Sequence, residues 1–157
     1  MHTNNEGGSG ADIIIPEMLT RSLDLLPDPY CIRTPEGRFL YANLATAKLA
    51  GLKSAQIIME RIDYEIPSLL FEDENNLEAW RYQDRKIIAN RKPLAMLEIH
   101  PNAVNTPYIC RKVPFYDNQN QCIGSFCSIK YLEVFSPNDF VKGKLPGSLL
   151  LNKPDDF

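Results

Sequence analysis

Apolar and polar residues alternate over two neighbouring stretches in the first third of the chain. Residues 30–34 and 38–42 are rich in strand-forming side chains, and a Pro-Glu-Gly sequence at 35–37 lies between them. Proline presets the backbone for a turn and glycine accepts a positive φ. The pattern therefore predicts an antiparallel hairpin, with Phe39 and Tyr41 on one face of its second strand.

Two short helices are predicted after the hairpin. Asn43 is suited to cap a helix over residues 44–50, and Gly51 is suited to the left-handed position after it. Residues 53–66 again carry apolar side chains at helical spacing, with a break expected near Asp63, and Pro67 would end that second helical stretch.

The longest predicted helix spans residues 71–90. Acidic residues crowd its first turn and basic residues follow its end, which matches the helix dipole. One face carries Leu77, Trp80, Asp84 and Ile87, so a single acid interrupts an apolar stripe. A carboxylate on such a face needs a partner or a ligand group, whereas a helix rotated by one residue would leave it solvated.

Three strands are predicted in the remaining part, over residues 94–100, 108–116 and 122–135. A polar sequence at 117–121 provides the turn before the last of them. Gly124 marks a bulge or a close backbone approach within that strand.

An amphipathic helix is predicted over residues 15–26, before the hairpin. Its stripe could pack on the sheet of the same chain or pair with the same helix of a second copy. Because the stripe is large for one edge of a small domain, we expect a homodimer. The interface candidates are Ile15, Met18, Leu19, Leu23 and Leu26.

Length and composition indicate one domain. The chain has 157 residues, a formal net charge of -3 and basic residues spread along its length, so this chain by itself is not expected to grip nucleic acid. Its purely apolar runs are far shorter than the roughly 20 residues of a membrane span. No signal peptide opens the chain, and a cytoplasmic protein is expected. Residues 1–12 have the composition of a disordered segment, and residues 136–157 that of a linker or tail.

Candidate chemistry is sparse. The two histidines and four cysteines show no metal-ligand spacing, and no phosphate loop or catalytic triad is present, so neither a metal site nor an enzyme is expected. Cys31, Cys110, Cys122 and Cys127 are interpreted as reduced, buried side chains, with thiol redox sensing as the alternative.

The string CIRTPEGRFLYANLATAKLAG, from Cys31 to Gly51, resembles the start of a PAS domain. The family has an apolar strand, an acidic-Gly turn, a second strand, and then Asn and a helix. Two strands, several helices, a long helix and three strands complete its order over about residues 24–135. The resemblance implies an α+β fold, with a five-stranded antiparallel sheet and helices on one face. The PAS domain would cover residues 13–135, including the N-terminal helix.

The resemblance also implies a ligand cavity between sheet and helices. Flavin-binding members carry a cysteine motif and haem-binding members a histidine near the long helix. Both are missing here, so an unidentified small organic ligand, or none, is expected. Ordinary core packing is the alternative for each apolar candidate. The candidates are Tyr41, Ile58, Met59, Ile62, Leu77, Trp80, Asp84, Ile109, Phe126 and Ser128.

The end of the chain, residues 149–157, resembles the approach to a LuxR-type helix-turn-helix domain, whose Phe-Thr-x-Arg-Glu signature would come next. This implies a sensory and dimerisation domain of a bacterial-type transcription regulator, which contacts DNA only through a domain absent from this chain. The alternative is a PAS input or protein-interaction module of a signalling kinase or cyclic-nucleotide enzyme. A small standalone enzyme would require an acid-base pair that the sequence does not offer.

Overall fold

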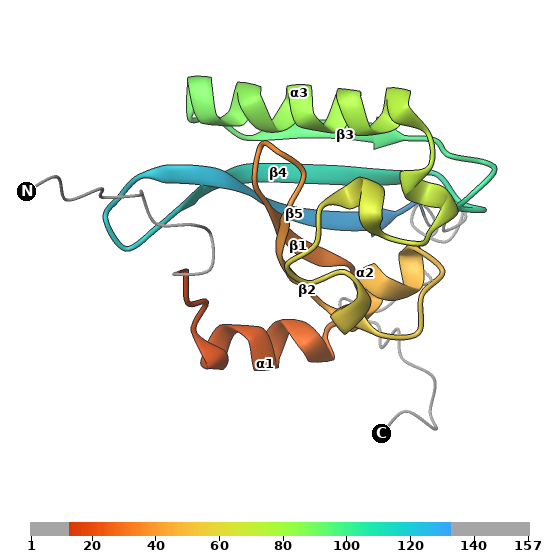
Figure 1. Cartoon of the computed structure of the whole chain (residues 1–157), viewed down its shortest axis with the longest axis horizontal. Helices are drawn as coiled ribbons and strands as arrows, with labels where there is room; N and C mark the ends of the chain where they lie inside the picture. The colour runs from red at the N-terminus through yellow and green to blue at the C-terminus, as the bar shows by residue number, and fades with distance from the viewer. Residues whose placement is uncertain (1–12, 133–157) are drawn as a thin grey trace, which may run out of the picture.

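The computed structural model describes residues 13–132 (Figure 1). The predicted disordered segment 1–12 and the predicted linker 136–157 lie outside the described residues. The elements, in which η denotes a short 3-10 turn, are α1 (Glu17–Leu25), β1 (Tyr30–Arg33), β2 (Phe39–Ala42), α2 (Leu44–Leu49), η2 (Ala55–Ile57), η3 (Asp63–Glu65), η4 (Leu69–Phe71), α3 (Glu74–Asn90), β3 (Leu94–Glu98), β4 (Tyr108–Tyr116) and β5 (Cys122–Tyr131).

The five strands form one sheet in the order β2-β1-β5-β4-β3, with every neighbouring pair antiparallel. The last strand therefore lies at the centre of the sheet. The main core packs between the inner face of the sheet and α2, the 3-10 turns and α3. Figure 1 shows α3 at the β3 end and α2 near β1 and β2. The predicted α+β fold, with its five-stranded antiparallel sheet and helices on one face, is confirmed.

The hairpin forms where predicted, but the faces of its second strand differ from the prediction. Ile32 pairs with Tyr41 and Arg33 pairs with Phe39, so that Leu40 is an extra residue in the ladder. Such a bulge breaks the strict alternation of a strand. Phe39 consequently points into the main core, whereas Tyr41 packs on the other face of the sheet. The predicted common face of Phe39 and Tyr41 is wrong.

The predicted helix over residues 53–66 is also wrong, because the backbone there bonds to the hairpin instead. The Glu60 N–H donates to the Phe39 carbonyl at 2.7 Å, and the Phe39 N–H donates to the Arg61 carbonyl at 2.9 Å. Glu60 has a φ of 67°, a left-handed conformation that ends any helix. Two short turns, η2 and η3, replace the helix on either side of this contact.

The long helix α3 begins at Glu74, three residues later than predicted. The Asp73 side chain caps it by accepting a backbone N–H two residues further on, at 2.9 Å. Arg91, with a φ of 54°, ends it in the left-handed conformation. The residues at which the prediction began the helix lie in η4 or in the connection to α3. The face predicted to be internal is buried, namely Leu77, Trp80, Asp84 and Ile87, and Gln83 is buried with it.

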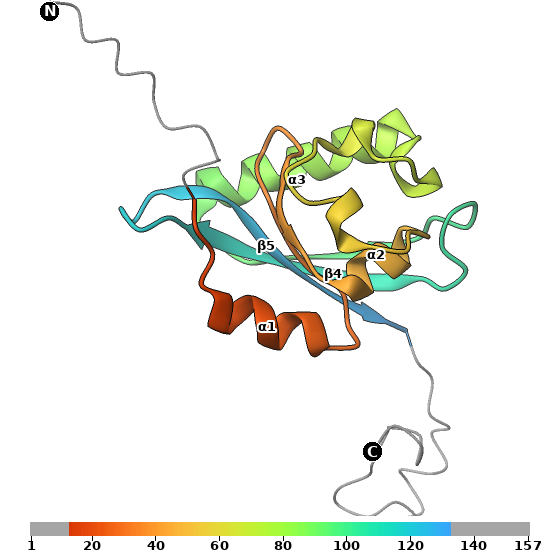
Figure 2. The same ribbon diagram turned by 60° about the horizontal axis from the view of Figure 1, so that its bottom comes forward.

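Helix α1 packs against the opposite, outer face of the sheet (Figure 2). Leu23 is 6% exposed and contacts a small cluster that contains Ile32 and Tyr41, with Ile15 at its edge. Packing within the chain, the first of the two alternatives for this helix, therefore accounts for Leu23 and Ile15. The other interface candidates, Met18, Leu19 and Leu26, are exposed.

No helix within residues 13–132 is long and apolar enough to cross a membrane.

Gly124 lies where β5 passes close to the backbone of β1. A Cβ atom there would stand 2.0 Å from the Arg33 carbonyl oxygen, a distance that ordinary packing does not allow. We expect Gly124→Ala to lower the free energy of unfolding in urea by about 3 kcal/mol, the upper end for overpacking. Gly51→Ala is the control, because Gly51 has a positive φ but no neighbour within 4 Å. Equal losses in the two variants would contradict the assigned contact.

Candidate functional site

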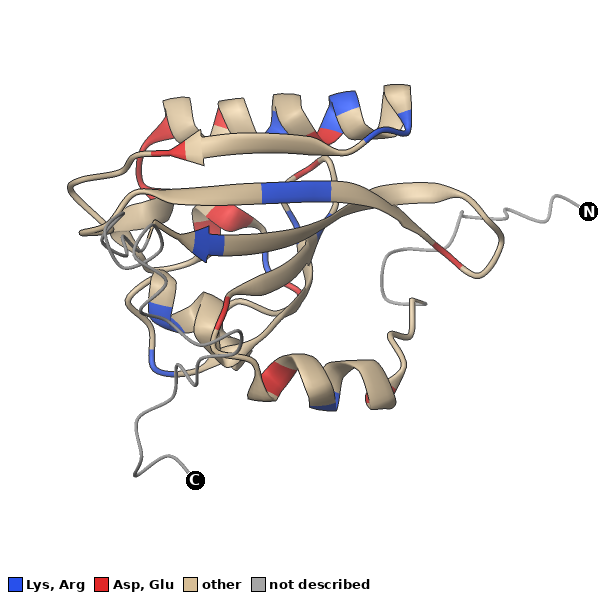
Figure 3. Ribbon diagram, turned by 180° about the vertical axis from the view of Figure 1, so that it is seen from behind, with Lys and Arg blue, Asp and Glu red and all other residues tan. Residues whose placement is uncertain are grey.

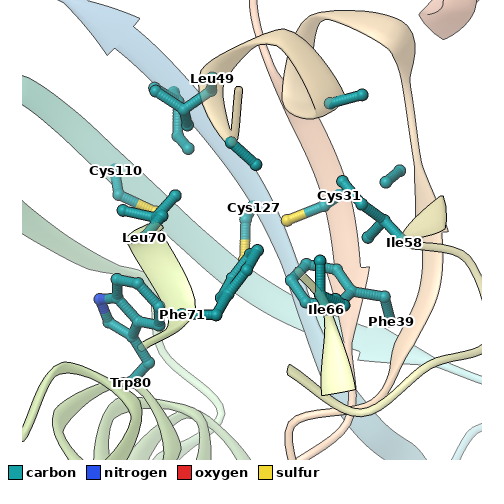
Figure 4. Packing of buried hydrophobic residues seen from close by; sticks show 14 of the residues in the cluster. Cys31, Phe39, Leu49, Ile58, Ile66, Leu70, Phe71, Trp80, Cys110 and Cys127 are labelled. Carbon is teal, nitrogen blue, oxygen red and sulfur yellow. The ribbon is translucent and has the colours of Figure 1, made fainter. Parts of the chain in front are cut away.

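A cavity with a free volume of about 50 Å³ lies between the inner face of the sheet and α2, η4 and α3. Aromatic rings form one wall in successive contacts, from Phe39 to Phe71 at 5.7 Å and from Phe71 to Trp80 at 6.0 Å between ring centroids. Both pairs meet edge to face, which is a favourable geometry for aromatic rings. Figure 4 shows these side chains converging with Leu49 and Leu70. The wall is preformed and apolar, as binding sites for small ligands usually are.

Two buried cations, Arg33 and Lys112, form a basic end of the cavity. Asp84 accepts from Lys112 Nζ at 2.9 Å, from Ser125 Oγ at 2.8 Å and from Arg33 Nε at 3.4 Å. Asp63 accepts from Arg33 at 3.0 Å. The sequence predicted that a buried Asp84 would need partners, and Lys112, Ser125 and Arg33 are those partners.

The two cations keep their charge inside the protein. Burial opposes the charged form of Lys112, but Cys127 and Asp84 hold its pKa above the ordinary value. The pKa of Arg33 is likewise raised: burial lowers it, but Asp84, Cys31, Cys127 and Asp63 together outweigh burial. The bond to Asp84 uses one of the three N–H groups of Lys112. A ligand in the cavity would thus meet a charged hydrogen-bond donor.

Glu98, the last residue of β3, forms an acidic end: it pairs with Tyr108 of β4, four residues along the strand from Lys112. Trp80 Nε1 donates to Glu98 Oε1 at 3.2 Å, and His100 Nε2 lies 2.7 Å from Glu98 Oε2. The rings of Trp80 and His100 meet edge to face at 5.6 Å, and Tyr108 continues the aromatic series. The cavity therefore offers an acceptor at one end and donors at the other.

Six of the ten predicted pocket residues lie outside the strands, and four of these six are buried. Trp80 lines the cavity, and Asp84 holds two of the cavity's cations. Ile58 and Leu77 are buried in the main core without lining the cavity. Met59 packs against the edge of the main core and against the edge of the small cluster under α1, and Ile62 is half-buried.

The other four predicted pocket residues, all on strands, do not line the cavity. Tyr41 and Phe126 belong to the cluster under α1 on the outer face. Ile109 and Ser128 are half-buried and alternate with the cavity-lining Cys110 and Cys127. On β2, β4 and β5 the predicted pocket residues thus point to the face of the sheet opposite to the cavity.

Arg33, Glu98 and Lys112 are cavity residues that the sequence reasoning missed. A signal was present, because each charge stands inside a predicted strand. Arg33 and Lys112 are two positions from Cys31 and Cys110, apolar-like residues of the same face. A charge in register with buried positions indicates an internal ion pair or a ligand contact. Among the residues that the structure describes, no cluster of histidine, cysteine and acidic side chains could hold a metal ion.

Comparisons with solved structures show which known proteins the chain resembles. A structure described as "VqmA bound to DPO" is 28% identical, with a TM-score of 0.63 over 75% of this chain and 59% of that one. A Vibrio cholerae VqmA dimer, described among LuxR-type receptors, is 26% identical, with a TM-score of 0.65 over 76% of this chain and 52% of that one. The chain thus spans between 52% and 62% of the length of the VqmA chains it matches.

A more distant structure shows the same fold. The PAS domain of Bordetella pertussis BvgS has a TM-score of 0.58 at 16% identity, covering 82% of this chain and 92% of that one. No curated protein matches the chain. The profile of the PAS fold matches residues 23–130, which is well over half of the sequence. With the sheet order, the position of the cavity and this match in agreement, the chain belongs to the PAS fold family.

Proposed function

We propose that the chain is the ligand-sensing and dimerisation domain of a cytoplasmic transcription regulator of the LuxR type. The observation that carries the proposal is the preformed cavity, with aromatic walls and opposite charges at its two ends. The likeness to VqmA, of which one structure holds DPO, supports it. Contact with DNA would come from another domain, since basic and acidic positions are interspersed over the described elements (Figure 3). No catalytic role is assigned to the domain.

The walls of the cavity suggest what kind of ligand it would take. Its free volume of about 50 Å³ is smaller than the roughly 150 Å³ of an apolar cavity that holds benzene, so a ring-sized compound would enter only if side chains moved apart. A flat ring would lie against Phe71 and Trp80, where edges and faces of aromatic side chains are both available. An acceptor on the ring would meet Lys112, and a donor would meet Glu98. DPO is the first compound to test.

We expect DPO to bind the chain in titration calorimetry, and we expect Lys112→Met to weaken that binding by roughly 10- to 100-fold. The loss corresponds to one hydrogen bond from a charged donor. The control is Arg111→Met, which removes a cation from the next residue of β4, an exposed one outside the cavity. Circular dichroism checks that both variants remain folded. Equal affinity of the two variants would contradict the assigned ligand position.

The dimer is proposed through the part of α1 that the fold leaves uncovered. Met18 and Leu25 are 86% and 87% exposed, and they stand seven residues apart on one face of the helix. Leu19 and Leu26 adjoin them and are also exposed. Because Leu23 is occupied within the chain, the interface would use this other face of the helix. The likeness to a VqmA dimer supports two-fold pairing.

Sedimentation at several concentrations tests the dimer. We expect the wild type to associate and the double variant Met18→Glu, Leu25→Glu to be monomeric at the same concentrations. Each buried side chain of this kind contributes roughly 1.5–3 kcal/mol to association. Arg21→Glu, which changes an exposed charge on the same helix, is the control. A wild type that stays monomeric at high concentration would end this proposal.

A role as the input module of a kinase is the alternative. The likeness to BvgS, at 16% identity, bears on the fold alone and favours neither role. The residues that follow Phe157 in the gene would distinguish the two.

A further inference from the structure

Three of the four cysteines face the same cavity. Cys31 on β1, Cys110 on β4 and Cys127 on β5 are free, buried thiols that line it, and Figure 4 shows their sulfur atoms pointing to one side of the sheet. Ser125 Oγ lies 3.6 Å from the Cys127 sulfur. Cys122, the fourth cysteine, is half-buried and does not line the cavity. Three thiols are therefore within reach of a small molecule that enters the cavity.

Strand register singles out one pair among these three thiols. Cys31 stands directly opposite Cys127 in the antiparallel pairing of β1 and β5. The Ile129 N–H donates to the Pro29 carbonyl at 3.0 Å, so residues 29 and 129 form a hydrogen-bonded pair. Two positions along, Cys31 and Cys127 form another. Pairs of this kind have Cα atoms about 5.5 Å apart, within the range of roughly 4.4–6.8 Å that a disulfide spans. The Cβ atoms of such pairs lie toward the wider end of about 4.5–5.5 Å, so a disulfide here requires the two strands to draw slightly closer.

Cys110 does not stand directly opposite Cys127. The residue opposite Cys127 on β4 is Lys112, which makes Cys110 a diagonal neighbour of Cys127. Diagonal positions of a sheet are about 7–8 Å apart, beyond the usual reach of a disulfide. Cys110 bonds to the Cys127 sulfur as a thiol donor, whereas Cys31 stands directly opposite Cys127, and we take Cys31 as the disulfide partner for that reason.

The surroundings of Cys127 favour its reactive form. Hydrogen bonds from Cys110 and then Cys31 lower the pKa of the Cys127 thiol well below its ordinary value, and Lys112 and Ser125 act in the same direction against the effect of burial. The pKa of Cys31 is raised, with its hydrogen bond to Cys127 as the main cause. One thiol of the pair thus favours the thiolate, the nucleophile of cysteine chemistry, while the other retains its proton.

We propose that Cys127 is a peroxide-reactive thiol in the wall of the cavity and that its oxidation links it to Cys31. The Cys127 thiolate attacks one oxygen of hydrogen peroxide. An S–O bond forms, the O–O bond breaks, and the departing hydroxide takes a proton from solvent to become water. The Cys31 sulfur then attacks the Cys127 sulfur, so that the S–S bond forms and the S–O bond breaks. The second hydroxide leaves as water with the Cys31 proton. Two thiols lose two electrons in total, and one peroxide becomes two waters.

This site is independent of the proposed ligand, since it needs only the cavity, the strand register and a peroxide. It would give the domain a response to oxidants from the same cavity that is proposed to bind a small organic compound. Reduction by a small dithiol would restore the original state.

The experiment treats the full chain with hydrogen peroxide and maps its cysteines by mass spectrometry under non-reducing conditions. We expect a peptide that contains Cys31 linked to one that contains Cys127, and the same product in Cys110→Ser and Cys122→Ser. Cys31→Ser should instead accumulate a sulfenic acid on Cys127, which dimedone traps. Cys127→Ser should give neither product.

Two results would overturn the inference. One is a wild-type chain whose Cys127 stays reduced at peroxide concentrations that oxidise the thiols of the urea-unfolded chain. The other is a disulfide to Cys110 or Cys122 as the main product. Both results are measured on the wild-type chain, so they do not depend on the folding of any variant.

Discussion

Replacing Asp84 with alanine is expected to lower the free energy of unfolding by about 3–5 kcal/mol, the usual loss when one partner of a buried ion pair is removed. Asp84 is fully buried and accepts hydrogen bonds from Lys112, Arg33 and Ser125. The alanine variant would leave Lys112 without the carboxylate that compensates its charge, while Arg33 would keep only Asp63. Urea unfolding, followed by circular dichroism, measures the loss.

The control is Glu78→Ala on the same helix. Glu78 pairs with Arg85 at 3.3 Å, but both side chains are largely exposed, so the expected loss is about 0–1 kcal/mol. Both variants remove one ion-pairing carboxylate from α3, but the carboxylate of Asp84 is buried whereas that of Glu78 is exposed. Losses within about 1 kcal/mol of each other would contradict the buried network.

Asn43→Ala is expected to cost about 3 kcal/mol, since it removes a helix cap and several buried bonds together. Asn43 Oδ1 accepts from the Tyr30 N–H, the Thr46 N–H and the Thr46 hydroxyl at 2.9–3.0 Å. Its Nδ2 donates to the Leu23 carbonyl at 2.8 Å and the Asp28 carbonyl at 3.0 Å. One buried side chain thus joins the end of α1, the start of β1 and the first turn of α2.

Asp73→Ala is the matched control for Asn43, because Asp73 caps α3 through a single exposed hydrogen bond. Its loss should be about 1 kcal/mol, the typical value of an N-cap. The difference between the two variants in the same urea titration reports the bonds that Asn43 makes beyond capping. If Asn43→Ala costs no more than Asp73→Ala, the joining role of Asn43 is refuted.

Features that depend on local chemistry could be predicted from the sequence. The turn at Gly37, the cap at Asn43 and the internal face of α3 from Leu77 to Ile87 all follow from residues within one or two turns of each other. Gly124 could be flagged as a bulge or a close approach, because a glycine inside a strand often marks one of the two, and the structure shows the close approach. The element order then sufficed to indicate the fold.

The candidate site could be predicted only in part, because strand faces depend on register between distant segments. The extra residue Leu40 turns Tyr41 away from the cavity. The residues around Leu40 carry no sequence pattern from which this bulge could be predicted. Arg33 and Lys112 come together from β1 and β4 only through β5, which lies between them. The contact of Glu60 with the hairpin is similarly long-range, and it replaced a helix that the spacing favoured.

The claim that the cavity is the ligand site is tested most directly by amide and indole chemical shifts in ¹⁵N-labelled chain titrated with DPO. Trp80 is the single tryptophan, so its indole N–H gives one assignable signal inside the cavity. The account predicts shifts for that indole and for the amides of Phe71 and Lys112, with little change at Leu97 and Arg111, which are exposed and lie outside the cavity. An unchanged Trp80 indole at saturating DPO, or shifts confined to the outer face of the sheet, would contradict it.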